Sequence, residues 1–136
     1  MNNINRIIVA GLLLMGFVVG CSTLPPYVGD WTGEGTFDGA SNSVVLAINN
    51  GGKFRGFLVG PTNQWHVGRF EVASSNAVRI VLKANVLTDL NSTYPAEDED
   101  VADASIEWVK GTKGDSTLVY QFKRKSGRTE FFRLTK

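Results

Sequence analysis

Few residues in this 136-residue chain carry side chains suited to catalysis or metal binding. Cys21 is the only cysteine and His66 is the only histidine. A zinc site needs three or four cysteine, histidine or carboxylate ligands, and no recognisable order of serine, histidine and acid surrounds His66. We therefore expect no metal, no cofactor and no enzyme activity. His66 is interpreted as a structural residue or a residue at the rim of the fold.

An acidic run, EDED at Glu97–Asp100, is the second feature whose side chains could bind a metal ion. Carboxylates are ligands for calcium, but calcium loops place them at alternate positions around a central glycine, and this run does not. Adjacent like charges repel, and Pro95 lacks the donor that a strand needs. We expect an exposed, solvated loop from Leu87 to Asp103, with no calcium bound.

Net charge gives no reason to expect a nucleic-acid partner. Without Arg6, which lies in the N-terminal stretch, the chain carries 13 basic and 13 acidic side chains. Their distribution is uneven, because acids gather over Glu97–Glu107 and bases over Lys110–Lys136. These segments are either solvated faces or a polar surface for a partner or for anionic lipid head groups.

The N-terminal stretch has the composition of a secretory signal. Arg6 precedes the uncharged apolar run Ile7–Val19, and a small residue, Gly20, follows it. A helix of this length reaches about 20 Å, which is too short to cross a hydrocarbon core of about 30 Å. A positive start, a short apolar run and a small residue are typical of a cleaved signal peptide.

The segment Val18–Ser22, VVGCS, resembles the lipobox of bacterial lipoproteins. This resemblance implies that the Cys21 thiol receives a diacylglycerol group and that the signal is cut before it. Ser22 rather than Asp at the next position implies sorting to the outer membrane, with the membrane itself as a partner through the acylated cysteine. We expect a signal peptide over 1–20, a lipidated tether over 21–28 and one domain over 29–136.

The domain sequence alternates between apolar and polar residues with a period of two, which is typical of half-buried strands. Trp31 and Phe37 share one face of DWTGEGTF, and Tyr120 and Phe122 share one face of STLVYQFK. Turn signals such as NNGG at 49–52 separate about eight such stretches. Short connections favour a single antiparallel up-and-down meander that closes into a small barrel, with a two-sheet β-sandwich as the alternative.

Gly29 and Trp31, separated by one residue, resemble the Gly-x-Trp motif of the calycins, the lipocalin, fatty-acid-binding and avidin barrels. The spacing onward through SVVLAINNGGKFRGFLVG is similar to the first three strands of avidins. The resemblance implies that Trp31 plugs the closed end of the barrel and that Arg133, from the last strand, packs across it. Thr32–Glu34 replace the polar biotin contacts of avidins, so biotin is not expected.

Two functions from different classes are consistent with these features. The first is a non-enzymatic binding module that holds a small apolar ligand in the barrel. Its lining, or otherwise the core, would comprise Phe54, Trp65, Trp108, Tyr120 and Phe122. The second is an accessory or inhibitory protein that binds another cell-envelope protein through its loops or an edge strand. A filled interior with an exposed apolar surface would favour the second function.

Overall fold

A computed structural model describes residues 23–37, 39–60, 63–91, 93 and 96–136. The predicted signal peptide 1–20 and the predicted lipidation site Cys21 lie outside these residues. Within the described part of the chain, no helix has the length and apolar character needed to cross a membrane.

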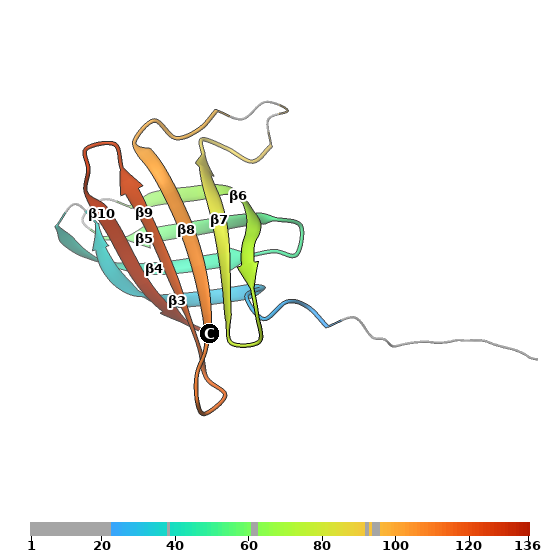
Figure 1. Cartoon of the computed structure of the whole chain (residues 1–136). Helices are drawn as coiled ribbons and strands as arrows, with labels where there is room; N and C mark the ends of the chain where they lie inside the picture. Colours follow the sequence, from blue (N-terminus) through green and yellow to red (C-terminus); the bar gives the residue numbers. More distant parts are fainter. Residues whose placement is uncertain (1–22, 38, 61–62, 92, 94–95) are drawn as a thin grey trace, which may run out of the picture.

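Eight antiparallel strands form a closed barrel in which each strand pairs with its neighbours in sequence and the last pairs with the first (Figure 1). The all-β meander is confirmed, and the alternative β-sandwich is wrong, because the strands close into one continuous sheet. The strands are β3 (Gly29–Phe37), β4 (Ala40–Ile48), β5 (Lys53–Val59), β6 (Gln64–Ser75), β7 (Arg79–Leu87), β8 (Val101–Lys110), β9 (Ser116–Arg124) and β10 (Thr129–Thr135).

Alternation along each strand decides which side chains fill the barrel. On β9, Leu118, Tyr120 and Phe122 are buried, whereas the residues between them face outward. The turn from β4 to β5 forms because the side-chain oxygen of Asn49 accepts hydrogen bonds from the backbone N–H groups of Gly51 and Lys53, both at 2.9 Å. Such local bonds fix the register of the next strand.

The seam between β3 and β10 depends on glycine. Arg133 pairs with Glu34, and Leu134 pairs with Gly33. A Cβ atom on Gly33 would lie 2.0 Å from the carbonyl oxygen of Arg133, so any side chain there would push the two backbones apart. Gly29, at the start of β3, has a φ of 134°, a conformation that residues with a side chain rarely adopt.

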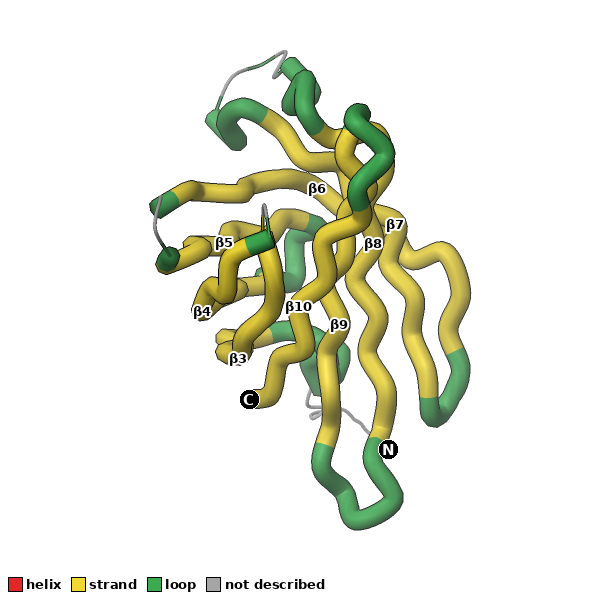
Figure 2. The backbone as a smooth tube through the Cα atoms, turned by 90° about the vertical axis from the view of Figure 1, so that its left-hand side faces the viewer, coloured by secondary structure: helices red, strands yellow, loops and turns green. Residues whose placement is uncertain are grey.

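The barrel has two different ends. Strands β3–β6 cross β7–β10 at a steep angle, so the barrel is strongly coiled (Figures 1 and 2). The described chain enters at the closed end, which also carries the β4–β5, β6–β7 and β8–β9 hairpins and the C-terminus. The opposite end, called the mouth, carries the β7–β8 loop and the β9–β10 hairpin.

The closed end is sealed by Trp31, which is fully buried and donates a hydrogen bond from Nε1 to the carbonyl oxygen of Tyr27 at 2.9 Å. Tyr27 and Val28, which were assigned to the tether, pack on the core, so the folded domain begins earlier than the predicted residue 29. The role implied for Arg133 is wrong. Arg133 is exposed on the outer face, with its guanidinium 5.6 Å from the Phe131 ring centre, and Lys136 Nζ lies 5.3 Å from the centre of the Trp31 ring instead.

The acidic loop is shorter than expected, because β8 already begins at Val101, which pairs with Arg124. Most of the described residues between 88 and 100 are exposed, as predicted. The loop nevertheless makes backbone hydrogen bonds at its acidic end. Asp98 N–H donates to the Val86 carbonyl, and the Asp100 carbonyl accepts from Lys125 N–H, both at 2.9 Å. The acidic end of the loop is therefore hydrogen-bonded to β7 and to the β9–β10 hairpin.

Candidate functional site: the barrel mouth and the outer face of β4–β6

Four of the five aromatic residues predicted to line a ligand cavity or form the core lie inside the barrel. Phe54, Trp108, Tyr120 and Phe122 are at most 5% exposed and belong to one continuous core. Trp65 does not belong there, because it is 64% exposed on the outer face of β6. Its neighbour His66 occupies the inward position, and adjacent residues of a strand cannot both point inward.

His66 is the central polar residue inside the mouth. Its Nδ1 lies 3.0 Å from the hydroxyl of Tyr120, and its ring contacts Phe122 at 4.7 Å between centres. The imidazole is 5% exposed, so it is held by aromatic packing on one side and by one hydrogen bond on the other. The sequence-based interpretation of His66 as a structural residue near the rim agrees with this position.

An ion pair lies beside it. Arg124 Nη1 is 3.2 Å from Glu130 Oε2, and the carboxylate side chain is only 1% exposed. The Arg124 guanidinium also lies 4.8 Å from the centre of the Phe37 ring. A cavity of about 40 Å³ opens between these groups, lined by Phe37, Gln64, His66, Asp98, Asp100, Val101, Phe122 and Arg124. That volume is large enough for a water molecule but too small for a ligand of acyl-chain size.

Burial sets the protonation states at the mouth. It lowers the pKa of His66, and the charge of Arg124 lowers it further, whereas Asp98 acts in the opposite direction. Burial also raises the pKa of Tyr120, with Asp98 adding to the effect. Near neutral pH the pair is therefore an uncharged imidazole and an uncharged phenol, which suits a packed interior rather than proton transfer.

The outer face of β3–β6 carries exposed apolar side chains, in contrast to the buried polar groups inside the mouth. Thr32, Val45, Phe57 and Trp65 are register partners across four consecutive strands, and we call them the outer row. Val45 is 46% exposed, and the Trp65 and Phe57 ring centres lie 4.6 Å apart. Val59, 44% exposed, extends the apolar surface on β5. A contiguous exposed apolar patch on a sheet face is one sign of a contact surface.

Two hollows lie beside the outer row, where the start of the β7–β8 loop curls over the sheet. One of about 430 Å³ includes Asp30, Ala47, Lys53, Arg55 and Leu90, and one of about 260 Å³ includes Arg55, Trp65, Val67 and Leu90. Arg55 lines both. Three exposed cationic side chains lie on this face. Lys53 is the register partner of Arg69 across β5 and β6, and Arg55 lies two residues further along β5 on the same face. None of the three makes an ion pair within the described residues.

The alternation of inward and outward side chains along the strands could have predicted further residues of the mouth. Glu130 shares its parity with Phe132 and Leu134, which face inward, and Arg124 shares its parity with Tyr120 and Phe122. Both charged residues were therefore readable from the sequence as inward-facing. Asp98 was not, because its position depends on the path of a long loop. The outer row also required the strand register, which the sequence alone does not give.

Comparison with known proteins finds no family model, no curated protein and no solved structure that matches this chain. Among the described residues no group of three histidine, cysteine, aspartate or glutamate side chains is arranged to hold a metal ion. The mouth and the outer row are therefore the features from which we infer a function.

Proposed function

We propose that this protein is a lipid-anchored, non-enzymatic lipoprotein of the bacterial outer membrane that binds another cell-envelope protein through the outer row. The observation that carries the proposal is the location of the exposed aromatic surface. It lies on the outside of a barrel whose interior is filled, so the surface free for contact is external.

The filled interior favours a protein partner over a small apolar ligand. Ligand cavities for small molecules usually measure about 300–1,000 Å³. Inside the barrel, the cavity at the mouth measures about 40 Å³, and the four predicted lining aromatics pack against one another or against the core. The hollow of about 430 Å³, which falls within the usual range, opens on the outside of the barrel beside the outer row. A barrel of eight strands has room for side chains and for little else.

The chemistry of the surface indicates the chemistry of the partner. Phe57 and Trp65 offer a flat aromatic pair, the type of residue that dominates contact energies in protein interfaces. Lys53 and Arg69 repel each other across the two strands, which costs stability unless an anion lies between them. We infer a partner segment with apolar side chains for the outer row and acidic side chains for these cations.

The anchoring part of the proposal depends on the lipobox-like segment at Val18–Ser22. Two or more acyl chains give stable membrane attachment, whereas one chain gives reversible attachment. The test is direct. Cys21→Ser should accumulate as an unprocessed precursor that incorporates no labelled palmitate, and normal maturation of that variant would contradict the anchor.

Site-specific photo-crosslinking in bacteria that produce the protein tests the partner. A photoreactive residue at Trp65 should yield a discrete adduct, and the same residue at Gln121, exposed on β9 across the barrel, should not. Adding Arg55→Glu to the Trp65 probe should abolish the adduct, because the acidic partner segment would be repelled. Equal adducts at both positions would contradict the proposal. A small molecule retained by the purified protein in native mass spectrometry would favour the ligand function instead.

A further inference from the structure

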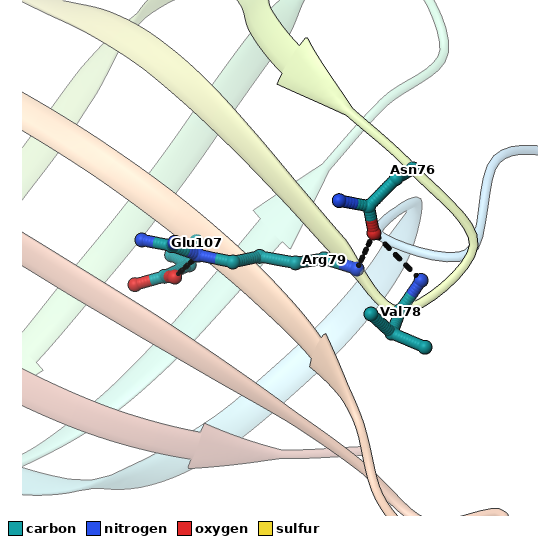
Figure 3. A network of polar contacts seen from close by, with 4 residues as sticks. All are labelled: Asn76, Val78, Arg79 and Glu107. Carbon is teal, nitrogen blue, oxygen red and sulfur yellow. Dashed lines mark hydrogen bonds and ion pairs between the residues drawn. The ribbon is translucent and has the colours of Figure 1, made fainter.

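The β6–β7 hairpin lies at the closed end of the barrel, and its tip is a hydrogen-bonded turn that exposes an aliphatic side chain. The side-chain oxygen of Asn76 accepts hydrogen bonds from the backbone N–H groups of Val78 and Arg79, both at 2.9 Å (Figure 3). Asn76 N–H donates in turn to the Arg79 carbonyl at 2.9 Å. The turn is therefore closed from both sides, and Val78 stands at its tip with 56% of its surface exposed.

The next hairpin adds positive charge beside this tip. Lys110 N–H donates to the Val78 carbonyl at 2.9 Å, so the two hairpins are joined. Lys110 and Lys113 are both exposed, and Asp115 is the acid on the same hairpin. Arg79 does not add to the charge of the tip, because it forms an ion pair with Glu107 (Figure 3). The tip thus combines an aliphatic side chain with two lysines against one aspartate.

The chain leaves the barrel at this same end. The closed end carries both hairpins and the described start of the chain in both views (Figures 1 and 2). Leu24, near that start, is 60% exposed, and Tyr27 is already fixed to the core, with its ring 5.6 Å from that of Phe70. The segment from Cys21 to Pro26 spans at most about 18 Å when fully extended. An anchor at Cys21 therefore holds this end of the barrel close to a bilayer.

We propose that the tip formed by the β6–β7 and β8–β9 hairpins rests on the lipid head groups, so that the mouth points away from the membrane. Val78 and Leu24 enter the interfacial region, and Lys110 and Lys113 face anionic phosphates. This orientation rests on the proposed anchor at Cys21, whereas the affinity of the tip for lipid does not, and it can be measured without the anchor.

The expected affinity of the tip alone is modest. Each lysine close to an anionic surface strengthens binding about fivefold, and Asp115 offsets one of the two. Lysine side chains also extend their charged ends to the phosphates while their methylene stems stay in contact with apolar surface. Contact of this strength orients a barrel that is already anchored, and on its own it gives weak, salt-sensitive binding.

A depth measurement tests the contact. Every strand and every core residue that the structure describes lies within 27–136, so a chain of residues 22–136 keeps the whole barrel and contains no cysteine. Val78→Cys in this chain takes a single environment-sensitive fluorophore, and Lys125→Cys, exposed on the β9–β10 hairpin, is the matched control. Phosphatidylethanolamine vesicles with phosphatidylglycerol should shift the emission of the probe at 78 to the blue and leave that at 125 unchanged. No shift at 78, or equal shifts at both positions, would overturn the orientation.

Charge reversal tests the electrostatic part independently. Lys110→Glu with Lys113→Glu should weaken binding of the 22–136 chain to the same vesicles by roughly tenfold or more, judged by co-sedimentation. Lys123→Glu with Lys125→Glu, at the mouth, should leave binding unchanged, and thermal melting of each variant checks that it is folded. Equal losses from the two double variants would overturn the proposal. Because neither measurement involves the acyl chain or the outer row, failure here is distinguishable from failure of the proposed function.

Discussion

The two ends of the barrel are closed by different physical means. At the closed end, the fully buried indole of Trp31 is hydrogen-bonded to the backbone of Tyr27, and Tyr27 and Val28 pack on the same core. At the mouth, a histidine–tyrosine hydrogen bond and an arginine–glutamate ion pair occupy the interior. The closed end therefore contributes stability that does not depend on pH, whereas the contribution of the mouth depends on which groups are charged.

The largest expected effect comes from the closed end. Trp31→Ala should lower the free energy of unfolding by about 3–5 kcal/mol, because it leaves a cavity in place of a fully buried tryptophan. Urea denaturation measures the loss. Trp65→Ala is the matched control, and it should change stability by about 0.5 kcal/mol or less, because Trp65 is 64% exposed. Similar losses for the two tryptophans would contradict the assignment of inner and outer faces.

The ion pair at the mouth should contribute somewhat less to the free energy of unfolding than Trp31 does. Glu130→Ala removes a carboxylate whose side chain is 1% exposed. The Arg124 side chain, which is 18% exposed, then loses its ion pair with Glu130. We expect a loss of about 2–3 kcal/mol, below the range for fully buried pairs because Arg124 retains some contact with solvent. Glu130→Gln, which keeps the shape and the acceptor oxygen, should lose less in the same urea measurement. A loss below that of Trp65→Ala would show that the pair is dispensable.

The pH dependence should come from His66. Because burial lowers its pKa in the folded state, the unfolded chain binds the proton first. The stability due to neutral His66 is thus fully present above pH 6.5, the ordinary pKa, and is lost as the pH falls toward the lowered value. Urea midpoints across this range should fall more steeply for the wild type than for His66→Gln. Parallel curves would contradict a buried neutral imidazole.

The smallest effect is expected from the acidic loop. A Gly-Ser linker in place of 96–100 is more flexible, so it should weaken the backbone hydrogen bonds to Val86 and Lys125. It removes no core residue, so the melting temperature should fall by only several degrees. It also removes Asp98, which raises the pKa of His66, so that pKa should fall further. His66 is the only histidine, and its ring signal in NMR titration reports the change directly. Global unfolding would show instead that the loop is part of the core.

The sequence predicted the architecture well because the local signals agree with one another. Alternation set the strands, and turn signals such as Asn49 to Gly52 set the short connections that a meander needs. The position of Trp31 was also correct. Its expected partner was not, because Arg133 was assigned by likeness to calycins although it differs in parity from the inward residues Phe132 and Leu134.

The sites were less predictable because they depend on pairing between distant residues. Trp65 and His66 are adjacent, and either could have been the inward residue until the partners of β6 were known. Val78 shares the parity of the buried residue Ile80, but the Asn76 turn places it outside the strand and leaves it exposed. The approach of Asp98 to His66 depends on a loop whose path no short-range pattern determines.

The glycine-lined seam between β3 and β10 has a consequence for how the chain acquires its fold. All other strand pairs join neighbours in sequence, whereas Thr32 pairs with Thr135, so this one contact spans nearly the whole domain. During synthesis β10 emerges last, and until then β3 and β9 are open edges that can recruit other strands. The same seam brings the two ends of the domain together, so a short linker from Lys136 to Thr23, with new ends opened at 112–114, should give a circularly permuted barrel.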